Sequence, residues 1–315
     1  MKAFTKYKYG GSEVLQLEEV NKPVLKNNHI LVKVLANSAN PADSHILRGR
    51  PFLARFSFGL FKPKDAILGI DFSGIVQEVS ANEDYFEVGD YVFGEMLGGG
   101  AFAEYACVPT NVCAKVPENV NFPIMASIPV AGLTAYQALI THGKIKAGES
   151  VLINGASGGV GHFAVQIAKA HGAKVTAVCS SRNIDFVQSI GADNVIAYDK
   201  VNIQEYKDNY DVIIDTHGNL KHDDYTRMGK RGVMVGFTTM GHMFSVLFKK
   251  AFSKFPLTQF TAEANTQDLK ILASLVKENK IKVYIEKTYQ YTQIPDAIKY
   301  IEKLRTRGKV VMVWE

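Results

Sequence analysis

A glycine-rich turn between a strand and a helix constrains the fold of this chain more than any other feature. The stretch VLINGASGGVG begins at Val151 with four residues typical of a buried strand, and its last seven residues include four glycines. An apolar-faced helical pattern then runs from about Gly159 to His171. The first turn of a helix offers unpaired N–H groups and the positive end of the helix dipole, and glycine lets a ligand approach the backbone closely. We therefore predict a phosphate site at this turn.

The surrounding pattern indicates that the phosphate belongs to a dinucleotide. Strand-like runs at 150–154, 174–178, 194–198, 210–215, 231–237 and 256–262 alternate with helical runs, which is typical of a parallel sheet with helices on both faces. The fingerprint positions are Ala156, Gly158 and Gly161, with Gly155 in front of the alanine. A tight turn that binds no ligand is the alternative interpretation. We expect the pyrophosphate to lie against the backbone of Ala156, Gly158, Gly159 and Val160.

The rest of the chain divides into a β-rich first third and a mixed C-terminal segment. Short strand-like runs broken by Gly, Pro, Asn and Asp fill the first third, and helical spacing begins after Pro117. The last fifty residues contain helical patterns at 266–280 and 294–305 and a final strand at 308–315. That strand does not extend the alternation, so we expect it to return to the N-terminal β domain. A length of 315 residues is consistent with two domains.

The composition is typical of a globular protein. The chain is 47% hydrophobic and 21% charged, and its net charge of +5 is too small to indicate nucleic-acid binding. Its three cysteines fit a reducing compartment without a disulfide framework. The N-terminus lacks the apolar core of a signal peptide, and no run approaches the roughly 20 apolar residues of a membrane-spanning helix. We expect a soluble, cytoplasmic protein that binds no nucleic acid.

The end of the second strand of the alternation indicates which dinucleotide is bound. An NAD site usually has an acid there, which accepts a hydrogen bond from the ribose 2′-OH. This chain has AVCSSRN, with no acid before Asp185. An acid would repel a 2′-phosphate, whereas arginine can pair with it through two hydrogen bonds. We predict NADPH as the cofactor and contacts from Ser180, Arg182 and Asn183; a solvated Arg182 at a helix start is the alternative.

With these motifs, the chain resembles the medium-chain dehydrogenase/reductase family, in its zinc-free quinone oxidoreductase and enone (2-alkenal) reductase branch. The resemblance runs nearly end to end and includes ILVKVLANSANPAD, GIDFSGIV, GDYVFG, FAEY, GASGGVG, GAD and the terminal GKVV. It implies an α/β fold with a GroES-like catalytic β domain at 1–118 and 262–315. It also implies a Rossmann NADPH-binding domain, with a doubly wound parallel sheet, at 119–261. A homodimer is the family expectation.

The resemblance also indicates where related alcohol dehydrogenases bind a catalytic zinc, with a cysteine, a His-Glu pair and a later cysteine or histidine. In this chain NPAD at 40–43 falls at the first of these positions and Ile70-Asp71 at the second. Cys107 and Cys113 have no second pair of cysteines near them, and Cys179 is remote in sequence. Because zinc sites need three or four Cys, His or carboxylate ligands, we predict no metal.

By resemblance, the NPAD motif lies beside the nicotinamide, and the catalytic candidates are Asn40, Asp43 and His45. The amide of Asn40 could donate to a substrate and accept from it. Asp43 could instead tie its turn together through backbone N–H groups, and His45 could be an ordinary surface or core residue.

Further positions match the family's cofactor contacts. By resemblance, Thr134 lines the nicotinamide pocket, Tyr198 reaches the ribose that carries the 2′-phosphate, and Lys309 touches the cofactor or the cleft. The backbone of Gly236 and Phe237 is expected beside the nicotinamide. The alternatives are a hydroxyl bonded within its own helix for Thr134 and a solvated side chain for Lys309.

Together these residues predict an NADPH-dependent, zinc-independent oxidoreductase. Hydride leaves C4 of the nicotinamide, and without a metal the acceptor must already be electron-poor, as a quinone or an α,β-unsaturated carbonyl is. The carbonyl oxygen that gains charge then needs hydrogen-bond donors held in place before reaction. Two alternatives stay open: a catalytically weak NADPH-binding protein, like some lens crystallins of this group, and a trans-acting enoyl reductase that serves a carrier-bound chain.

One stretch is not explained by the resemblance. No acid occurs from Tyr225 to Ala262, and FSVLFKKAFSKF, within the basic amphipathic stretch 240–256, has helical spacing. We expect Lys249, Lys250 and Lys254 on one face of this helix and an apolar face made of Phe244, Leu247, Phe248, Ala251, Phe252 and Phe255. We favour a lid or dimer-edge helix; a helix on an anionic membrane surface and an apolar substrate wall stay open.

Overall fold

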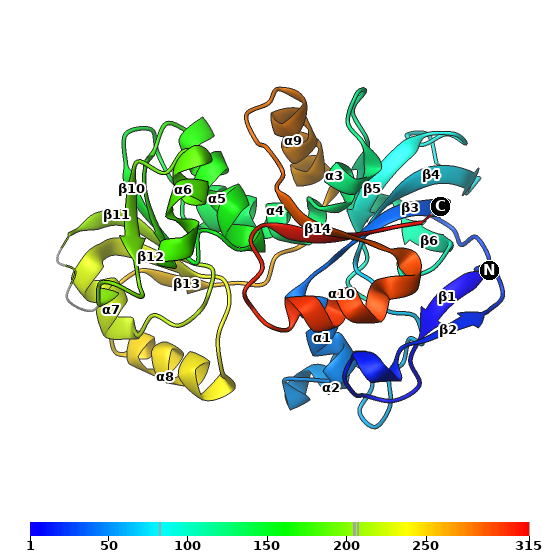
Figure 1. Cartoon of the computed structure of the whole chain (residues 1–315), viewed down its shortest axis with the longest axis horizontal. Helices are drawn as coiled ribbons and strands as arrows, with labels where there is room; N and C mark the ends of the chain where they lie inside the picture. The colour runs from blue at the N-terminus through cyan, green and yellow to red at the C-terminus, as the bar shows by residue number, and fades with distance from the viewer. Residues whose placement is uncertain (82, 204–205, 207, 315) are drawn as a thin grey trace. The chain divides into compact units, whose positions relative to one another are not determined.

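The computed structural model of the chain describes residues 1–315 except 82, 204–205, 207 and 315. Its residues fall into two units (Figure 1). Unit 1 comprises Met1–Leu133, Ala264–Glu278 and Val283–Glu315, and unit 2 comprises Thr134–Glu263 and Asn279–Lys282. No helix within the described part of the chain is long and apolar enough to cross a bilayer.

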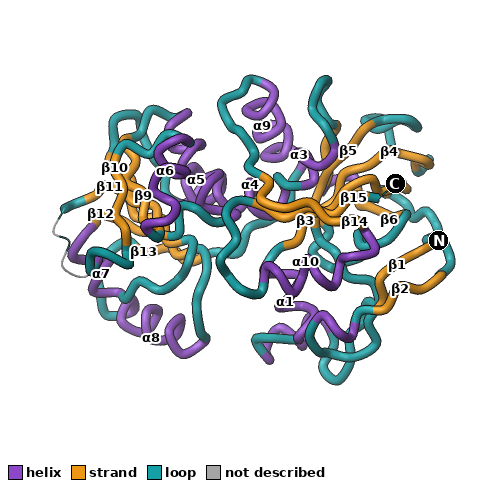
Figure 2. Tube along the Cα trace, in the orientation of Figure 1, coloured by secondary structure: helices purple, strands orange, loops and turns teal. Residues whose placement is uncertain are grey.

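Unit 2 is built on one sheet whose strands run in the order β10-β9-β8-β11-β12-β13, and every pairing is parallel. Its strands are β8 (Ser150–Asn154), β9 (Lys174–Cys179), β10 (Asn194–Ala197), β11 (Tyr210–Asp215), β12 (Gly229–Met234) and β13 (Leu257–Gln259). Its helices are α5 (Gly159–Ala170), α6 (Ile184–Ser189), α7 (His222–Met228) and α8 (Met240–Ala251). Figure 2 shows these strands among their helices. The predicted parallel sheet is confirmed, and residues such as Val212 and Ile213 are fully buried in it, as two-sided cover requires.

Unit 1 is mostly β-structure. Its larger sheet has the order β14-β15-β3-β4-β5-β7, with β6 also paired to β3, and β1 pairs with β2 separately. The strands are β1 (Lys2–Thr5), β2 (Gln16–Glu19), β3 (His29–Ala39), β4 (Asp71–Val79), β5 (Tyr91–Glu95), β6 (Tyr105–Pro109), β7 (Cys113–Lys115), β14 (Ile285–Gln290) and β15 (Lys309–Val313). The helices are α1 (Pro41–Arg48), α2 (Arg55–Phe58), α3 (Phe122–Ala126), α4 (Pro129–Tyr136, which ends in unit 2), α9 (Thr266–Lys277) and α10 (Ile294–Ile301).

The final strand returns to the N-terminal sheet, as predicted. β15 lies antiparallel to β3, with Val310 opposite Ala39, and parallel to β14. The indole N–H of Trp314 donates to Oδ1 of Asn37 at 2.5 Å. Residues from the two ends of the chain therefore share one core, and Val310, Met312 and Phe72 are fully buried in it.

The boundaries of the two units differ from the expected 119 and 262. Residues 119–133 belong to unit 1, where Ser73 Oγ donates to the carbonyl of Phe122 at 2.7 Å and the N–H of Val130 donates to Asp71 Oδ1 at 3.0 Å. Residues 279–282 belong to unit 2, because the side-chain amide of Gln166 makes two hydrogen bonds with the backbone of Lys282. These contacts join segments that are distant in the sequence, which helical spacing does not reveal.

Helix α8 forms within the expected basic stretch. It packs on the core of unit 2 through buried Val246 and half-buried Met243 and Leu247. Of the residues expected on its apolar face, Leu247 and Phe255 pack against this core, whereas Phe244, Phe248 and Phe252 are exposed.

Candidate active site

The glycine-rich turn between β8 and α5 has the geometry that its sequence requires. Gly155 adopts φ +80°, a backbone conformation that residues with a side chain rarely adopt. A Cβ on Gly161 would lie 2.1 Å from the carbonyl oxygen of Gly155, so the helix can pack on the turn only with glycine there. These two glycines serve the tight turn and the close packing of helix on strand.

Gly158 is different, because the packing of the protein does not require it. It precedes the first turn of α5 with φ −79°, and a Cβ built on it would meet only the Gly155 carbonyl oxygen, at 3.5 Å. The space beside Gly158 is therefore open where a side chain would otherwise stand. An open backbone at the N-terminus of a twelve-residue helix fits the close approach of a pyrophosphate.

This turn also lies where the strand order of the sheet changes direction. From β8 the chain continues to β9 and β10 on one side, and β11, β12 and β13 lie on the other. Ligands of open parallel sheets bind beyond the carboxyl ends of the strands at such a point. The predicted cofactor residues of unit 2 follow the carboxyl ends of β8, β9, β10 and β12 and so gather at one edge: Ala156, Gly158, Gly159, Val160, Ser180, Arg182, Asn183, Tyr198, Gly236 and Phe237. Thr134 is half-buried on α4, outside this group.

The turn after β9 is tied to the glycine-rich turn by Asn183. Its amide nitrogen lies 2.9 Å from Ser157 Oγ and 3.3 Å from Ser180 Oγ. Asn183 is buried, so its amide joins the two turns. Arg182, beside it, is exposed. The structure therefore gives Asn183 a positioning role and leaves Arg182 the more accessible of the two.

An acid that the sequence analysis missed lies next to this turn. Asp199 accepts from the backbone N–H of Ser181 at 2.7 Å and from its hydroxyl at 2.6 Å, and the hydroxyl bond is the main cause that lowers the pKa of Asp199. The pairing of β10 with β9 could have indicated this contact. In that pairing Ala197 lies opposite Cys179, and the N–H of Tyr198 donates to the Cys179 carbonyl. Residues that follow β10 must therefore lie beside residues that follow β9.

Buried Asp215 organises the loop after β11, although the sequence analysis did not single it out. Its carboxylate accepts hydrogen bonds from the backbone N–H groups of His217, Gly218 and Leu220, and from the side chains of Asn154 and Tyr225. This fixes the loop against the end of β8.

The loop after β11 also packs closely on the segment after β12. Gly218 has φ +71°, and a Cβ on it would lie 2.1 Å from the carbonyl oxygen of Gly236. The predicted nicotinamide contacts Gly236 and Phe237 are thereby held in place, and the Phe237 side chain is exposed.

In unit 1, the predicted catalytic residue Asn40 lies in a buried polar cluster with Lys309 and Asp71. Lys309 Nζ donates to Asn40 Oδ1 at 2.6 Å and lies 3.4 Å from Asp71 Oδ2, and Asn40 Nδ2 donates to the same carboxylate oxygen at 2.8 Å. Asn40 is 2% exposed. Both groups of its amide have protein partners, and its contact with a substrate stays a prediction. Lys309 is also 2% exposed, so the alternative of a solvated side chain is wrong. Its contact with the cofactor or the cleft stays a prediction.

Two more acids complete this polar cluster. Asp43 is fully buried, and its Oδ2 accepts from the backbone N–H of Asn40 at 2.8 Å, which is the structural role considered as the alternative. Burial raises the pKa of Asp43 and that of Glu95 to about 8 each, and it lowers the pKa of Lys309. Burial therefore favours the uncharged form of Asp43, Glu95 and Lys309.

The third catalytic candidate, His45, lies on the exposed face of α1, while Ile46 and Leu47 beside it are buried. It lies outside the polar cluster. No group of three or more His, Cys, Asp or Glu side chains among the described residues could hold a metal. Asn40 and Asp71, at two positions where the resemblance places zinc ligands, instead bind the Lys309 ammonium group.

Comparison with known proteins places this geometry in a family. The model of the "Alcohol dehydrogenase GroES-like domain" matches residues 26–118, and that of the "Zinc-binding dehydrogenase" matches residues 190–312. A chloroplast envelope quinone oxidoreductase homolog of Arabidopsis thaliana is 33% identical over 320 residues, which cover 96% of this chain and 95% of that protein. The NADPH-dependent alkenal/one oxidoreductase of the same plant is 32% identical over 99% of this chain and 79% of its own.

Solved structures agree with the sequence relatives. The quinone oxidoreductase from Coxiella burnetii has a TM-score of 0.90 at 31% identity, and the match covers 100% of this chain and 99% of that one. The Escherichia coli quinone oxidoreductase in complex with NADPH has a TM-score of 0.84 at 25% identity and full coverage of both chains. The chain belongs to the medium-chain dehydrogenase/reductase family, with a GroES-like domain and a Rossmann-type parallel sheet. Within that family it groups with the quinone oxidoreductases and enone reductases.

Proposed function

We propose that this chain is an NADPH-dependent oxidoreductase that transfers hydride to a quinone or to an α,β-unsaturated carbonyl. The observation that carries the proposal is the open backbone at Gly158, at the N-terminus of α5 and at the change of strand order. Relatives named quinone oxidoreductase and NADPH-dependent alkenal/one oxidoreductase support the same reaction class.

The residues of unit 2 fit four parts of the cofactor. The N–H groups at the start of α5 would bind the pyrophosphate, and Arg182 with Ser180 would bind the 2′-phosphate. Tyr198, which is exposed beside that turn, would cover the adjoining ribose, and the backbone of Gly236 and Phe237 would lie along the nicotinamide. NADPH, when bound, supplies the hydride from C4 of its nicotinamide. The protein must exclude water there and hold the acceptor within about 3.5 Å of that carbon.

The cofactor preference can be tested at Arg182. We expect Arg182→Ala to lower kcat/KM for NADPH by about 10- to 150-fold, which corresponds to the loss of a charge-assisted phosphate pair of about 1.5–3 kcal/mol. The value for NADH should change little, because NADH lacks the 2′-phosphate, and it serves as the internal control. Steady-state kinetics with both cofactors measure this. A parent protein that prefers NADH would refute the assignment.

The reaction class can be tested with a panel of acceptors. Purified protein and NADPH are mixed with quinones, with enones and with unactivated ketones, and NADPH oxidation is followed by absorbance. Turnover should occur with at least one of the first two groups and not with the ketones. Tight NADPH binding without turnover would favour the weak NADPH-binding alternative. A trans-enoyl reductase of Aspergillus terreus is 32% identical over 91% of this chain, so carrier-bound enoyl thioesters belong in the same panel.

We also propose a homodimer in the cytoplasm. All three cysteines are free, which fits a reducing compartment. Analytical ultracentrifugation and cell fractionation test the two statements; a monomer, or a protein that fractionates with an organelle, would refute the respective one.

A further inference from the structure

One surface of unit 1 carries large apolar side chains that are exposed within the described part of the chain. Residues 50–64, here called the aromatic–basic segment, contain α2 and the loops on either side of it. Phe52 is 60% exposed, Phe56 is 66% exposed and Phe61 is 90% exposed, and Leu53 is more than half exposed. The rings of Phe52 and Phe56 meet edge to face at 6.5 Å. Proteins rarely leave such a group of apolar side chains in water unless a partner covers it.

The same segment is strongly basic. No acid occurs between Asp43 and Asp65, whereas Arg50, Arg55, Lys62 and Lys64 lie within that interval. Arg50, Lys62 and Lys64 are exposed. The surface therefore combines an apolar centre with a rim of positive charge.

Polar contacts within unit 1 hold this segment so that its apolar side chains face outward. Arg55 Nε donates to the carbonyl of Gly49 at 3.0 Å, and the guanidinium lies over the Tyr9 ring. The hydroxyl of Tyr9 donates to the carbonyl of Gly59, and the N–H of Lys64 donates to the carbonyl of Phe58 at 2.8 Å. The exposure of the phenylalanines is thus a property of an anchored segment.

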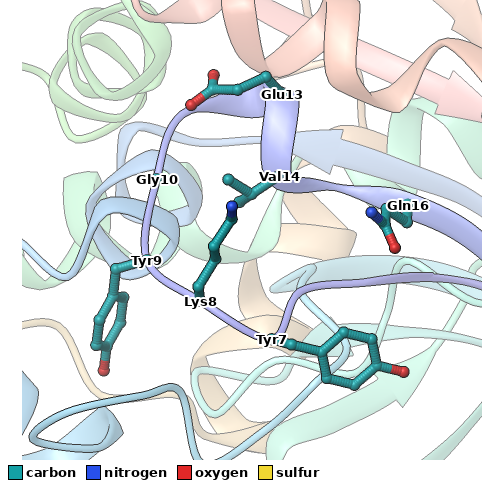
Figure 3. A pocket seen from close by; sticks show the side chains of 7 residues that line it. All are labelled: Tyr7, Lys8, Tyr9, Gly10, Glu13, Val14 and Gln16. Carbon is teal, nitrogen blue, oxygen red and sulfur yellow. The ribbon is translucent and has the colours of Figure 1, made fainter.

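Tyr9 also links the segment to a shallow pocket at the N-terminal turn of unit 1. Figure 3 shows the residues that line it, which are Tyr7, Lys8, Tyr9, Gly10, Glu13, Val14 and Gln16. Tyr7 is 61% exposed and Lys8 is exposed. An aromatic side chain and a cation thus lie next to the residue that anchors the segment, although the carboxylate of Glu13 gives the pocket a mixed charge.

We propose that the aromatic–basic segment of residues 50–64 lies on an anionic lipid surface, with its phenylalanines in the headgroup region and its lysines and arginines against the phosphates. An apolar centre with a basic rim is complementary to such an interface. A second copy of this chain is a poorer partner, because each copy of the segment would bring the exposed cations Arg50, Lys62 and Lys64 to a two-fold interface without an acid of its own to pair with them. The proposal does not depend on the reductase activity.

Helix α8 offers a matched comparison, because it also exposes phenylalanines and lysines. Its Lys249, however, forms an ion pair of 2.6 Å with Asp223 on α7, and Asp224 follows in the same helix. Asp223 thus offsets part of the charge of its basic face, whereas no ion pair is seen for Arg50, Lys62 or Lys64 within the described part of the chain; Asp65 directly follows Lys64. We expect α8 to contribute little to lipid binding.

The test is co-sedimentation of the full chain with vesicles of phosphatidylcholine, with and without phosphatidylserine, at low and at high salt. We expect binding that requires phosphatidylserine and weakens with salt. Each basic residue near an anionic surface contributes about a fivefold factor, so Lys62→Gln with Lys64→Gln should lower the partition coefficient by about 25-fold. Phe56→Ser with Phe61→Ser should lower it by about tenfold or more. The matched control is Lys249→Gln with Lys250→Gln, which should leave binding unchanged.

Two controls show whether a loss of lipid binding is caused by unfolding or by loss of catalytic activity. Lys62→Gln with Lys64→Gln should retain the melting temperature and the turnover of a water-soluble acceptor. No binding by the parent protein, or binding lost only in the α8 variant, would overturn the proposal. So would retention of the parent on an acidic polypeptide resin without binding to vesicles, because that result would assign the segment to an acidic protein partner.

Discussion

Replacing Lys309 with methionine is expected to destabilise unit 1 by about 3–5 kcal/mol. Methionine fills much of the same volume, but it leaves the Asp71 carboxylate, which is fully buried, without its cation. It also removes the donor to Asn40 Oδ1, which lies 2.6 Å away. The only tryptophan, Trp314, lies in unit 1, so its fluorescence during urea denaturation reports on this unit.

Two further variants identify the cause of that loss. Lys309→Met combined with Asp71→Asn should recover part of the stability, because the unpaired charge is then gone. Lys26→Met, at an exposed position, should change the free energy of unfolding by less than about 0.5 kcal/mol. A Lys309→Met protein as stable as the parent would show that the buried ion pair is not required.

Gly158→Val is expected to abolish NADPH binding while the protein stays folded. The valine side chain would occupy the open space beside the N-terminus of α5, where protein atoms lie no closer than 3.5 Å to its Cβ. We expect affinity to fall by about 100-fold or more, equal to about 2.7 kcal/mol. Titration calorimetry with NADPH and a thermal melt measure the two properties separately.

Gly161→Val is the contrasting variant, since its Cβ would lie 2.1 Å from the carbonyl oxygen of Gly155. It should lower the melting temperature as well as the affinity. Unchanged NADPH affinity in a folded Gly158→Val protein would mean that this turn does not hold the pyrophosphate.

The order of strands and helices could be predicted from the sequence, because hydrophobic periodicity and turn residues act over a few neighbouring positions. The run from Ser150 to Gly161 contains strand, turn and helix start in twelve residues, and the structure forms each of them there. The return of the last strand could be predicted because Lys309–Val313 follows a helix without continuing the alternation.

The contents of the polar cluster in unit 1 could not be predicted in the same way. Asn40 and Lys309 are 269 positions apart, and Asn40 and Asp71 are 31 apart. Only the pairing of β15 with β3 and of β3 with β4 brings them together. The sequence therefore did not reveal the hydrogen bonds that link Asn40 to Asp71 and Lys309.

The packed face of α8 and the contact between Asp199 and Ser181 could not be predicted, because both depend on contacts between residues that are distant in the sequence. Phe244 and Leu247 are equally apolar, but only packing against the core decides which of them is covered. The pairing of β10 with β9 brings Asp199 to Ser181, although the two residues are well separated in the sequence.

The most direct test of the central claim is NADPH oxidation by protein that has been dialysed against a strong chelator, with its metal content measured in parallel. The account predicts that metal-depleted protein oxidises NADPH with a quinone or an enone as fast as the untreated protein does, and faster than it oxidises NADH. Stoichiometric zinc, with turnover that is lost on dialysis and restored by added zinc, would contradict it, as would the absence of turnover with both acceptors.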